Sequence, residues 1–315
     1  MLEKKEKNGL IVLITIFVVA LLFTFARNFF SVNLNLITKN SDDETQKSLI
    51  SKKNSGEYFA VLYITGTIQE KNNEYNQQWL LKTIKGLKND SKNSGILLFI
   101  DSPGGTVYHS DEAYLALLDY KSSGKKVYSY FASMAASGGY YIGCAGDKIF
   151  ANRNCLTGSI GVISASSVDV TGLLEKIGIK AYTIHTGKNK TMLNPSEPLT
   201  DEQQKIMQSL SDEAYEQFTQ IVAESRKMDI EKVKTLADGR IYSALQAKNN
   251  GLVDEVFTLE EAKSYIKNES QTELSFKTFK YERPDNIMTL LEGLSFLRDP
   301  QKALFGTKGL CYLYK

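Results

Sequence analysis

The sequence is poor in histidine and cysteine, the side chains that most often bind transition metals. It has two histidines, His109 and His185, which leave few ligands for zinc and weaken any catalytic site built from serine, histidine and aspartate. The three cysteines, Cys144, Cys155 and Cys311, follow no metal-ligand spacing and cannot all pair with one another. We therefore expect no metal, no cofactor and no disulfide framework, with a single Cys144–Cys155 bridge left open.

An excess of charge of one sign is also missing. The 38 Lys and Arg residues are balanced by 36 Asp and Glu residues, so the formal net charge is only +2. A nucleic-acid-binding protein needs a strong local excess of basic residues, so we expect no nucleic-acid partner. The hydrophobic fraction of 42% is ordinary for a folded protein, and 315 residues are enough to bury a core.

The longest apolar run lies at the N-terminus. Residues 10–26 carry no charge and follow a basic tip with Lys4, Lys5 and Lys7. The run approaches the ~20 residues that cross a bilayer and lacks a good signal-peptidase site, although a cleaved signal peptide is the alternative. Basic flanks stay in the cytoplasm, so residues 1–30 are predicted to form a cytoplasmic tip and a single retained transmembrane anchor.

The rest of the chain alternates between two kinds of segment. Residues 31–56 are polar without periodicity, as in a linker. Short apolar runs then alternate with longer amphipathic segments, which predicts an α/β fold with parallel strands and flanking helices over residues 57–268. The predicted strands are Tyr58–Ile64, Gly95–Asp101 and Lys126–Phe131, and the predicted helices are 74–90, 106–122 and Thr200–Met228. Residues 269–315 have weaker patterning and are predicted to be a peripheral C-terminal tail.

Two glycine-rich motifs follow consecutive predicted strands. In DSPGG, which ends at Gly105, the glycine pair frees backbone N–H groups to face a ligand crevice, as half of an oxyanion hole requires, although Pro-Gly also marks ordinary turns. In SMAASGGYY, small residues surround Ser137, and the N–H of Gly138 would face the same crevice. Ser137 is a candidate nucleophile or merely a helix cap, and Ser133 is a weaker candidate.

A serine nucleophile needs a base. His109 lies one turn into the predicted helix after DSPGG, and His185 ends a predicted strand, so neither is well placed. A lysine can serve when desolvation or positive neighbours lower its pKa. Composition alone does not choose among the lysines of this chain.

Five blocks in order resemble one known family. They are DSPGG, SMAASGGYYI, TGSIGVI, GKNK and DGRIYSALQAKNNGLVDEV. From about Tyr58 to Lys267 the chain is similar to signal peptide peptidase A, also called protease IV. These are bacterial membrane proteases with the Clp protease and crotonase-like fold, a ββα superhelix.

The resemblance implies a role for each matching residue. It implies that Ser137 is the nucleophile, that Lys190 of the GKNK block is the base, and that Ser159 orients the lysine amine. It implies that Gly105 and Gly138 are the oxyanion donors. Lys188 remains a competitor for the base. Two departures from the family pattern, Thr191 and Glu197, lie on the loop that follows the lysine.

The resemblance also implies an assembly, a substrate class and a location. Single-domain relatives form rings in which a neighbouring subunit supplies the lysine, so we expect a homo-oligomer. The implied substrates are apolar peptides such as signal-peptide remnants, cleaved outside the cytoplasmic membrane of a bacterium by a Ser-Lys endopeptidase. An inactive membrane scaffold of the same fold and a crotonase-type acyl-CoA enzyme are the alternatives.

Overall fold

The computed structural model describes residues 56–270, 274–283 and 311–313. These residues belong to one of the two compact units into which the chain divides, Gly56–Lys315. The predicted anchor and all but the last residue of the predicted linker lie outside the described residues. Within the described ranges, no helix combines the length and the apolar character that crossing a membrane requires.

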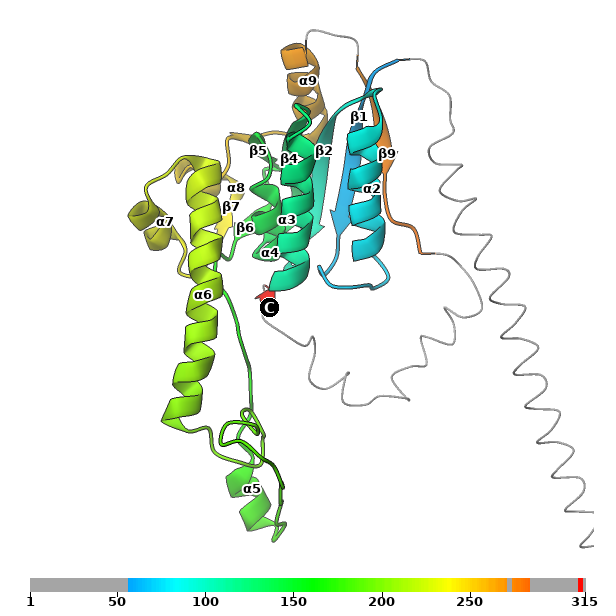
Figure 1. Ribbon diagram of the computed structural model, residues 1–315. Coiled ribbons are helices and arrows are strands. Elements are labelled where there is room, and N and C mark those ends of the chain that lie inside the picture. The colour runs from blue at the N-terminus through cyan, green and yellow to red at the C-terminus, as the bar shows by residue number, and fades with distance from the viewer. Residues whose placement is uncertain (1–55, 271–273, 284–310, 314–315) are drawn as a thin grey trace, which may run out of the picture. The chain divides into compact units, whose positions relative to one another are not determined.

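Among the described residues, an eight-stranded and mostly parallel sheet forms the centre of the unit (Figure 1). Its order is β7-β6-β4-β2-β1-β9, with β5 beside β4 and β8 beside β5. Neighbouring strands run parallel, except that β7 is antiparallel to β6. The strands are β1 (Tyr58–Thr65), β2 (Asn93–Ser102), β4 (Lys126–Ala136), β5 (Lys148–Ala151), β6 (Leu156–Gly158), β7 (Ile241–Ser243), β8 (Glu255–Val256) and β9 (Ser275–Phe279). The predicted α/β fold with parallel strands is confirmed.

Several helices begin at residues whose side chains cap them. Asn76 accepts a hydrogen bond from the Trp79 amide at 2.9 Å, and Thr200 forms a reciprocal capping box with Gln203, which satisfies amides that have no partner inside the helix. The helices are α2 (Gln77–Asn89), α3 (Val107–Lys121), α4 (Gly138–Gly143), α5 (Thr171–Lys176), α6 (Asp201–Arg226), α7 (Ile230–Leu236), α8 (Ala244–Asn249) and α9 (Leu259–Ser270). The three helices predicted from the sequence correspond to α2, α3 and α6.

Both faces of the sheet are covered, which explains why its strands are apolar at nearly every position. Successive residues of a strand point to opposite faces. Leu62 therefore packs in the larger core with α2 and α3, whereas Val61 packs in a smaller core beneath α9. Each such side chain that is fully buried contributes about 1.5–3 kcal/mol to stability.

Part of the segment predicted as a peripheral tail belongs to the sheet. Strand β9 lies within residues 269–315 and pairs with β1 as a parallel edge strand. A second short strand of this segment, β10 (Cys311–Leu313), pairs antiparallel with β3 (Gly104–Thr106) in a separate two-stranded sheet. The pattern of residues 275–279 is weak because an edge strand buries little of its surface, and the side chains of β9 are half-buried or exposed.

Candidate active site

Ser137 occupies a sharp turn between a strand and a helix. It follows the last residue of β4 and precedes Gly138, the first residue of α4. Its φ of 53° and ψ of −117° lie outside the regions that ordinary L-residues favour, which costs about 1–3 kcal/mol. Ser137 stands at the N-cap position of α4, but its side chain makes no capping hydrogen bond, so side-chain capping does not explain a serine here. Strain at a serine on a strand-to-helix turn is typical of a nucleophile.

Strand β6 holds the turn and brings Ser159 beside it. The Ser137 amide donates to the Gly158 carbonyl at 2.8 Å, and Ala136 is the register partner of Gly158. Ser159 follows directly, with a φ of 49°, and its amide donates to the Arg240 carbonyl at 2.8 Å. The structure thus brings the predicted nucleophile and the predicted base-orienting serine to neighbouring positions, both buried.

Gly105 packs against the backbone of the preceding loop. A Cβ at this position would lie 1.8 Å from the Ile68 carbonyl oxygen, so only glycine fits. The Thr106 amide donates to that carbonyl at 2.9 Å and holds the strand in place. With Gly138 directly after Ser137, the two predicted oxyanion donors come from the ends of consecutive strands, as the sequence predicts.

The two loops are tied together by residues whose roles were not predicted. The Met134 amide donates to the Asp101 carboxylate at 3.0 Å, which joins the second motif to the first. Ser102 Oγ accepts from the Gly104 amide at 3.1 Å and donates to the Gly66 carbonyl at 2.7 Å. Both side chains stand in the DSPGG motif, but their partners come from other elements, so spacing alone could not assign these roles.

Lys190 lies on a different part of the unit, which we call the arm and define as residues 163–213. Its side chain is exposed, and no hydrogen bond or ion pair joins it to Ser137 among the described residues. Figure 1 shows α5 beyond the lower end of α6, whereas α4 is level with the middle of that helix. Lys188 contacts Glu202 in the first turn of α6, and the Lys190 amide donates to the Gly187 carbonyl at 3.1 Å.

The geometry of α6 separates the arm from Ser137. Gln217 of α6 donates to the Tyr141 hydroxyl of α4 at 2.7 Å, close to the Ser137 turn. Glu202 lies fifteen positions earlier, so at ~1.5 Å per residue it is roughly 22 Å away along the helix axis. One chain alone therefore does not bring Lys190 to Ser137.

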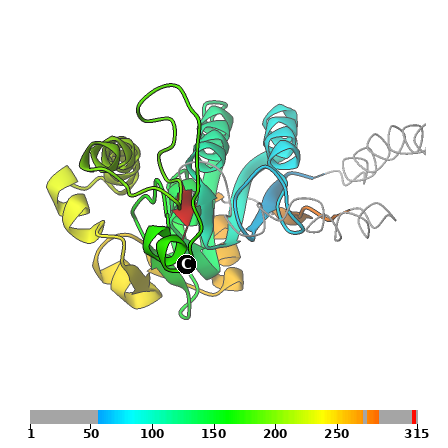
Figure 2. The same cartoon turned by 90° about the horizontal axis from the view of Figure 1, so that it is seen from below.

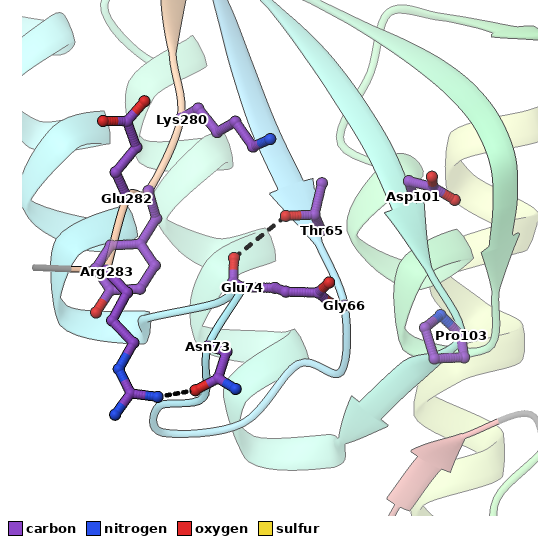
Figure 3. Close-up of a pocket in the computed structure, with 10 residues that line it drawn as sticks. Thr65, Gly66, Asn73, Glu74, Asp101, Pro103, Lys280, Glu282 and Arg283 are labelled. Atoms are coloured by element: carbon purple, nitrogen blue, oxygen red, sulfur yellow. Dashed lines mark hydrogen bonds between the residues drawn. The ribbon is translucent and has the colours of Figure 1, made fainter. Parts of the chain in front are cut away.

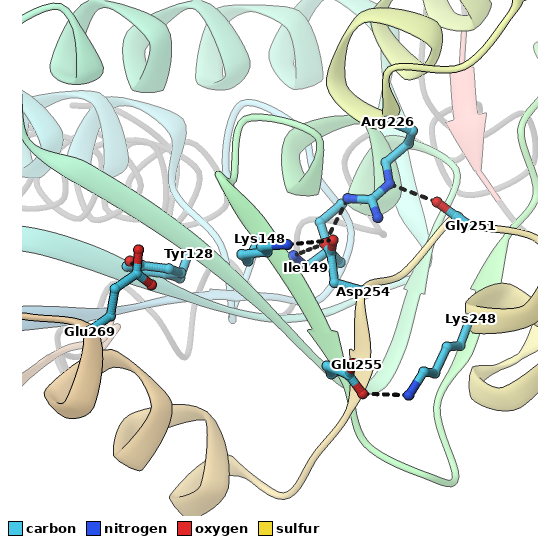
Figure 4. A network of polar contacts seen from close by, with 9 residues as sticks. All are labelled: Tyr128, Lys148, Ile149, Arg226, Lys248, Gly251, Asp254, Glu255 and Glu269. Atoms are coloured by element: carbon cyan, nitrogen blue, oxygen red, sulfur yellow. Dashed lines mark hydrogen bonds and ion pairs between the residues drawn. The ribbon is translucent and has the colours of Figure 1, made fainter.

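A largely buried ion pair anchors the other end of α6 (Figure 4). Arg226 Nη1 lies 2.8 Å from the Asp254 carboxylate, and Arg226 Nε donates to the Gly251 carbonyl at 2.9 Å. The Ile149 amide donates to Asp254 at 2.8 Å. Burial alone raises the pKa of Asp254, but the hydrogen bonds from Arg226 and Ile149 outweigh it, so this pKa is lowered.

The structure shows the surroundings of both histidines and of Cys144 and Cys155. His109 Nδ1 lies 2.6 Å from the Thr106 hydroxyl, and burial lowers the pKa of His109. His185 is exposed beside the Gly187 carbonyl. Cys144 and Cys155 are buried free thiols, so they form no bridge, and burial raises the pKa of each to about 12. Among the described residues, no group of three or more acidic, histidine or cysteine side chains is placed to hold a metal ion.

A cleft of about 600 Å³ borders the DSPGG loop (Figure 3). It is lined by the carboxyl ends of β1 and β2, including Asp101 and Pro103, and by residues 280–283. Its charges are mixed, with Glu74 and Asp101 facing the same space as Arg283. None of the predicted catalytic residues lines it, so we place the chemistry at the Ser137 turn rather than in this cleft.

Comparison with known proteins shows to which family the chain belongs. The model of the family named Peptidase family S49 matches residues 119–273. A protein of Enterococcus faecium, provisionally named signal peptide peptidase SppA, is 37% identical over 253 residues, which cover 78% of this chain and 73% of that one. The chain belongs to peptidase family S49. It is therefore a serine peptidase, and its resemblance to signal peptide peptidase A is confirmed.

Other relatives of this S49 chain are longer. "Serine protease SPPA, chloroplastic" of Arabidopsis thaliana is 32% identical over 68% of this chain, and "Protease 4" of Salmonella typhi is 30% identical over 68%. The chain spans only 32% and 35% of their lengths. Among solved structures, a ClpP1 variant from Listeria monocytogenes is 21% identical, with a TM-score of 0.43, over 64% of this chain and 92% of that one. A likeness this weak carries no conclusion, so the superhelical subclass of the fold stays a prediction.

Proposed function

We propose that the chain is a membrane-bound endopeptidase that cleaves apolar peptides with a Ser-Lys dyad. The observation that carries this proposal is the Ser137 turn. A buried serine with a strained backbone and no side-chain capping bond follows one strand, and the Gly105 loop follows the strand beside it. Helix capping would not require that combination, whereas acyl transfer does.

The proposed mechanism passes through an ester. The neutral amine of Lys190 accepts the proton of the Ser137 hydroxyl, whose oxygen attacks a peptide carbonyl carbon. The N–H groups of Gly105 and Gly138 stabilise the oxyanion, and Ser159 orients the lysine amine. The protonated lysine then gives its proton to the leaving amine. Water hydrolyses the acyl-enzyme and regenerates Ser137.

Two observations favour Lys190 of a neighbouring subunit as the base. Lys188 contacts the Glu202 carboxylate, whose pKa is lowered mainly by the hydrogen bond from Lys188, so the amine of Lys188 is already engaged. The arm also exposes apolar side chains that a single chain leaves uncovered, as an oligomer interface would require. They are Ile163, Val168, Leu173, Ile177, Ile179, Tyr182, Ile184, Leu199 and Leu210. A lysine acts as a base only where it is desolvated, and covering the arm would supply that environment.

Mixing two inactive variants tests the dyad and its location together. Ser137→Ala and Lys190→Ala should each abolish cleavage of an apolar peptide, while Lys188→Ala, the matched control, retains it. If neighbouring subunits share the site, unfolding the two inactive variants together and letting them co-assemble restores activity in about a quarter of the sites. The interface joins different surfaces of two subunits, so a site is active only when one subunit supplies Ser137 and its neighbour supplies Lys190. No recovery in verified mixed assemblies, or full activity in Lys190→Ala, would contradict the proposal.

The membrane location rests on residues 10–26, which lie outside the described residues. We propose that this run anchors the chain in the cytoplasmic membrane with the peptidase outside the cytoplasm, close to apolar peptides left in the bilayer. Membranes washed with alkaline carbonate should retain the complete chain and release a variant without residues 1–30. Release of both would contradict the anchor.

A further inference from the structure

The register between β2 and β4 changes just before both strands reach the site. Ile100 is the register partner of Phe131, and the next pair is Ser102 with Ala135. β2 thus advances by two residues while β4 advances by four, so Asp101 alone faces three residues of β4. Figure 2, seen from below, faces the carboxyl ends of these strands, with α2 and α3 on one side of the sheet and α9, in orange, on the other. The irregularity is a β-bulge at the edge that carries both glycine-rich motifs.

The bulge decides which part of the DSPGG loop stands beside Ser137. Two positions beyond the last register pair, the two chains reach Gly104 and Ser137. With a regular register, Ser137 would instead be level with Thr106, which is two residues or roughly 7 Å farther along β2. The extra residues of β4 therefore bring Ser137 level with the glycine pair that ends in Gly105.

Asp101 is hydrogen-bonded on both sides of its strand. Its carbonyl accepts from the Gly66 amide at 3.0 Å, which fixes its backbone to the end of β1. Its carboxylate accepts from the Met134 amide at 3.0 Å. Met134 lies in the bulge and has no register partner in β2. The side chain of Asp101 thus satisfies an amide that the ladder between β2 and β4 leaves without a partner.

The two neighbours of β4 hold Ser137 in different ways. On the β6 side, the Ser137 amide donates to the Gly158 carbonyl at 2.8 Å, which fixes the turn directly. On the β2 side, the pair of Ser102 with Ala135 and the bond from the Asp101 carboxylate follow the bulge and set its form. The position of Ser137 relative to β2, the strand that leads to the oxyanion donor, therefore depends on Asp101.

We propose that Asp101 is a positioning residue for the reaction of Ser137. Its carboxylate is an acceptor at a fixed distance from β2, and it keeps the bulge in the form that sets Ser137 beside the N–H of Gly105. The inference rests on the proposed function, and Asp101 acts through Met134 rather than on the reacting atoms. A displacement of about 1 Å between reacting groups costs about 10²-fold in rate, so a bond at this distance from the chemistry still affects turnover.

Three substitutions separate the length of the Asp101 side chain from its charge. Asp101→Ala removes the acceptor, and kcat for a labelled apolar decapeptide should fall by about 10²-fold while KM stays within about twofold. Asp101→Asn keeps a carbonyl oxygen at the same distance and should retain kcat within about threefold. Asp101→Glu keeps the charge but moves the carboxylate by one methylene group, and kcat should fall by about tenfold or more.

Asp147 provides the matched control at the opposite end of β4. Its carboxylate accepts from the Val127 amide at 3.0 Å and pairs with Lys121. Asp147→Ala removes a bond of the same kind from the same strand, so it should lower the denaturation midpoint without changing kcat. The rate at which a fluorophosphonate labels Ser137 is measured in the same samples, because it reports alignment of the site without peptide binding. This rate should fall in Asp101→Ala and stay unchanged in Asp147→Ala.

The outcomes distinguish this inference from the proposed function. Equal kcat in Asp101→Ala and the unmodified protein would overturn the positioning role and leave the peptidase in place. An inactive Asp101→Asn beside an active Asp101→Glu would overturn it too, because charge rather than the bond to Met134 would then matter. If Asp101→Ala does not fold, the Asn and Glu variants decide by this comparison. If the unmodified protein neither cleaves the decapeptide nor reacts with the fluorophosphonate, the proposed function fails and the inference fails with it.

Discussion

The Ser137 turn and the arm differ in how completely one chain builds them. Around Ser137 the backbone is buried and hydrogen-bonded from three directions, by β6, by the DSPGG loop and by the start of α4. The arm, residues 163–213, carries nine of the fourteen exposed large hydrophobic side chains in the part of the chain that the structure describes. The nucleophile half of the proposed site is complete in one chain, and the lysine half is not.

This difference teaches where assembly could control activity. The turn that holds Ser137 is already rigid in a single chain. Regulation would therefore act through the arm, which a single chain leaves uncovered. Helix α6 has a buried part and an exposed part. Phe218 is fully buried, whereas Leu210 is 42% exposed. The helix is anchored at one end, and the loop that carries Lys188 and Lys190 lies at the other.

The largest effect should come from adding one methyl group at Gly105. In Gly105→Ala the Cβ would lie 1.8 Å from the Ile68 carbonyl, so the loop must move and its N–H is lost to the oxyanion. We expect kcat to fall by about 10²–10³. Gly86→Ala, where the added Cβ meets no atom within 4 Å, is the control and should keep full activity. Normal kcat in Gly105→Ala would remove this residue from the site.

The next effect is on stability, at the anchored end of α6. Asp254→Asn leaves Arg226 buried without its partner and should lower the free energy of unfolding by about 3 kcal/mol at pH 7. A carboxyl with a lowered folded pKa stabilises above its unfolded pKa of about 3.9, and this contribution disappears as pH falls through the lower folded value. Denaturation curves should therefore show the difference shrinking below about pH 4.

An exposed ion pair nearby provides the control for that measurement. Lys248 and Glu255 contact each other at the surface (Figure 4), and Glu255→Gln should change stability by less than about 1 kcal/mol. A difference between Asp254→Asn and wild type that stays constant down to pH 2 would contradict the assigned ionisation.

A smaller effect is expected from a substitution on the arm, and it should change only the assembly of the subunits. Ile184 is fully exposed, so Ile184→Asp should leave the unfolding of the single chain unchanged within about 0.5 kcal/mol. Sedimentation should show the dissociation constant of the oligomer rising about tenfold, and activity at low protein concentration should fall with it. Leu245→Asp, at an exposed position of α8, is the control. Unchanged assembly would exclude this part of the arm from the interface.

The smallest effect concerns the two departures from the family pattern, which contact each other. Thr191 Oγ1 donates to the Glu197 carboxylate at 2.8 Å, and this bond is the main reason why the pKa of Glu197 is lowered. Thr191→Ala should loosen the loop after Lys190 and reduce kcat by about two- to threefold. Thr186→Ala, an exposed threonine of the same arm, should not. A kcat of Thr191→Ala equal to that of the unmodified protein would show that the bond between Thr191 and Glu197 does not position Lys190.

Most of the helices and strands that carry the site could be predicted from the sequence. Strands β1, β2 and β4 bury both faces, which leaves nearly unbroken apolar runs, and α6 begins at a capping box that four residues encode. β9 escaped prediction because an edge strand that buries little surface needs no apolar pattern, and the three residues of β10 are too few to show one. The role of Asp101 escaped it too, since the Met134 amide comes from another strand.

What the sequence by itself determined is local and chemical: the fold class, the order of the motifs, and the residues Ser137, Gly105 and Gly138 at consecutive strand ends. Tertiary structure alone decided between a capping and a strained Ser137, because backbone angles depend on the β6 pairing that holds the turn. It also placed the loop of Lys188 and Lys190 beside the start of α6 and β10 on the edge of β3. Contacts between distant segments depend on packing, which no local pattern encodes.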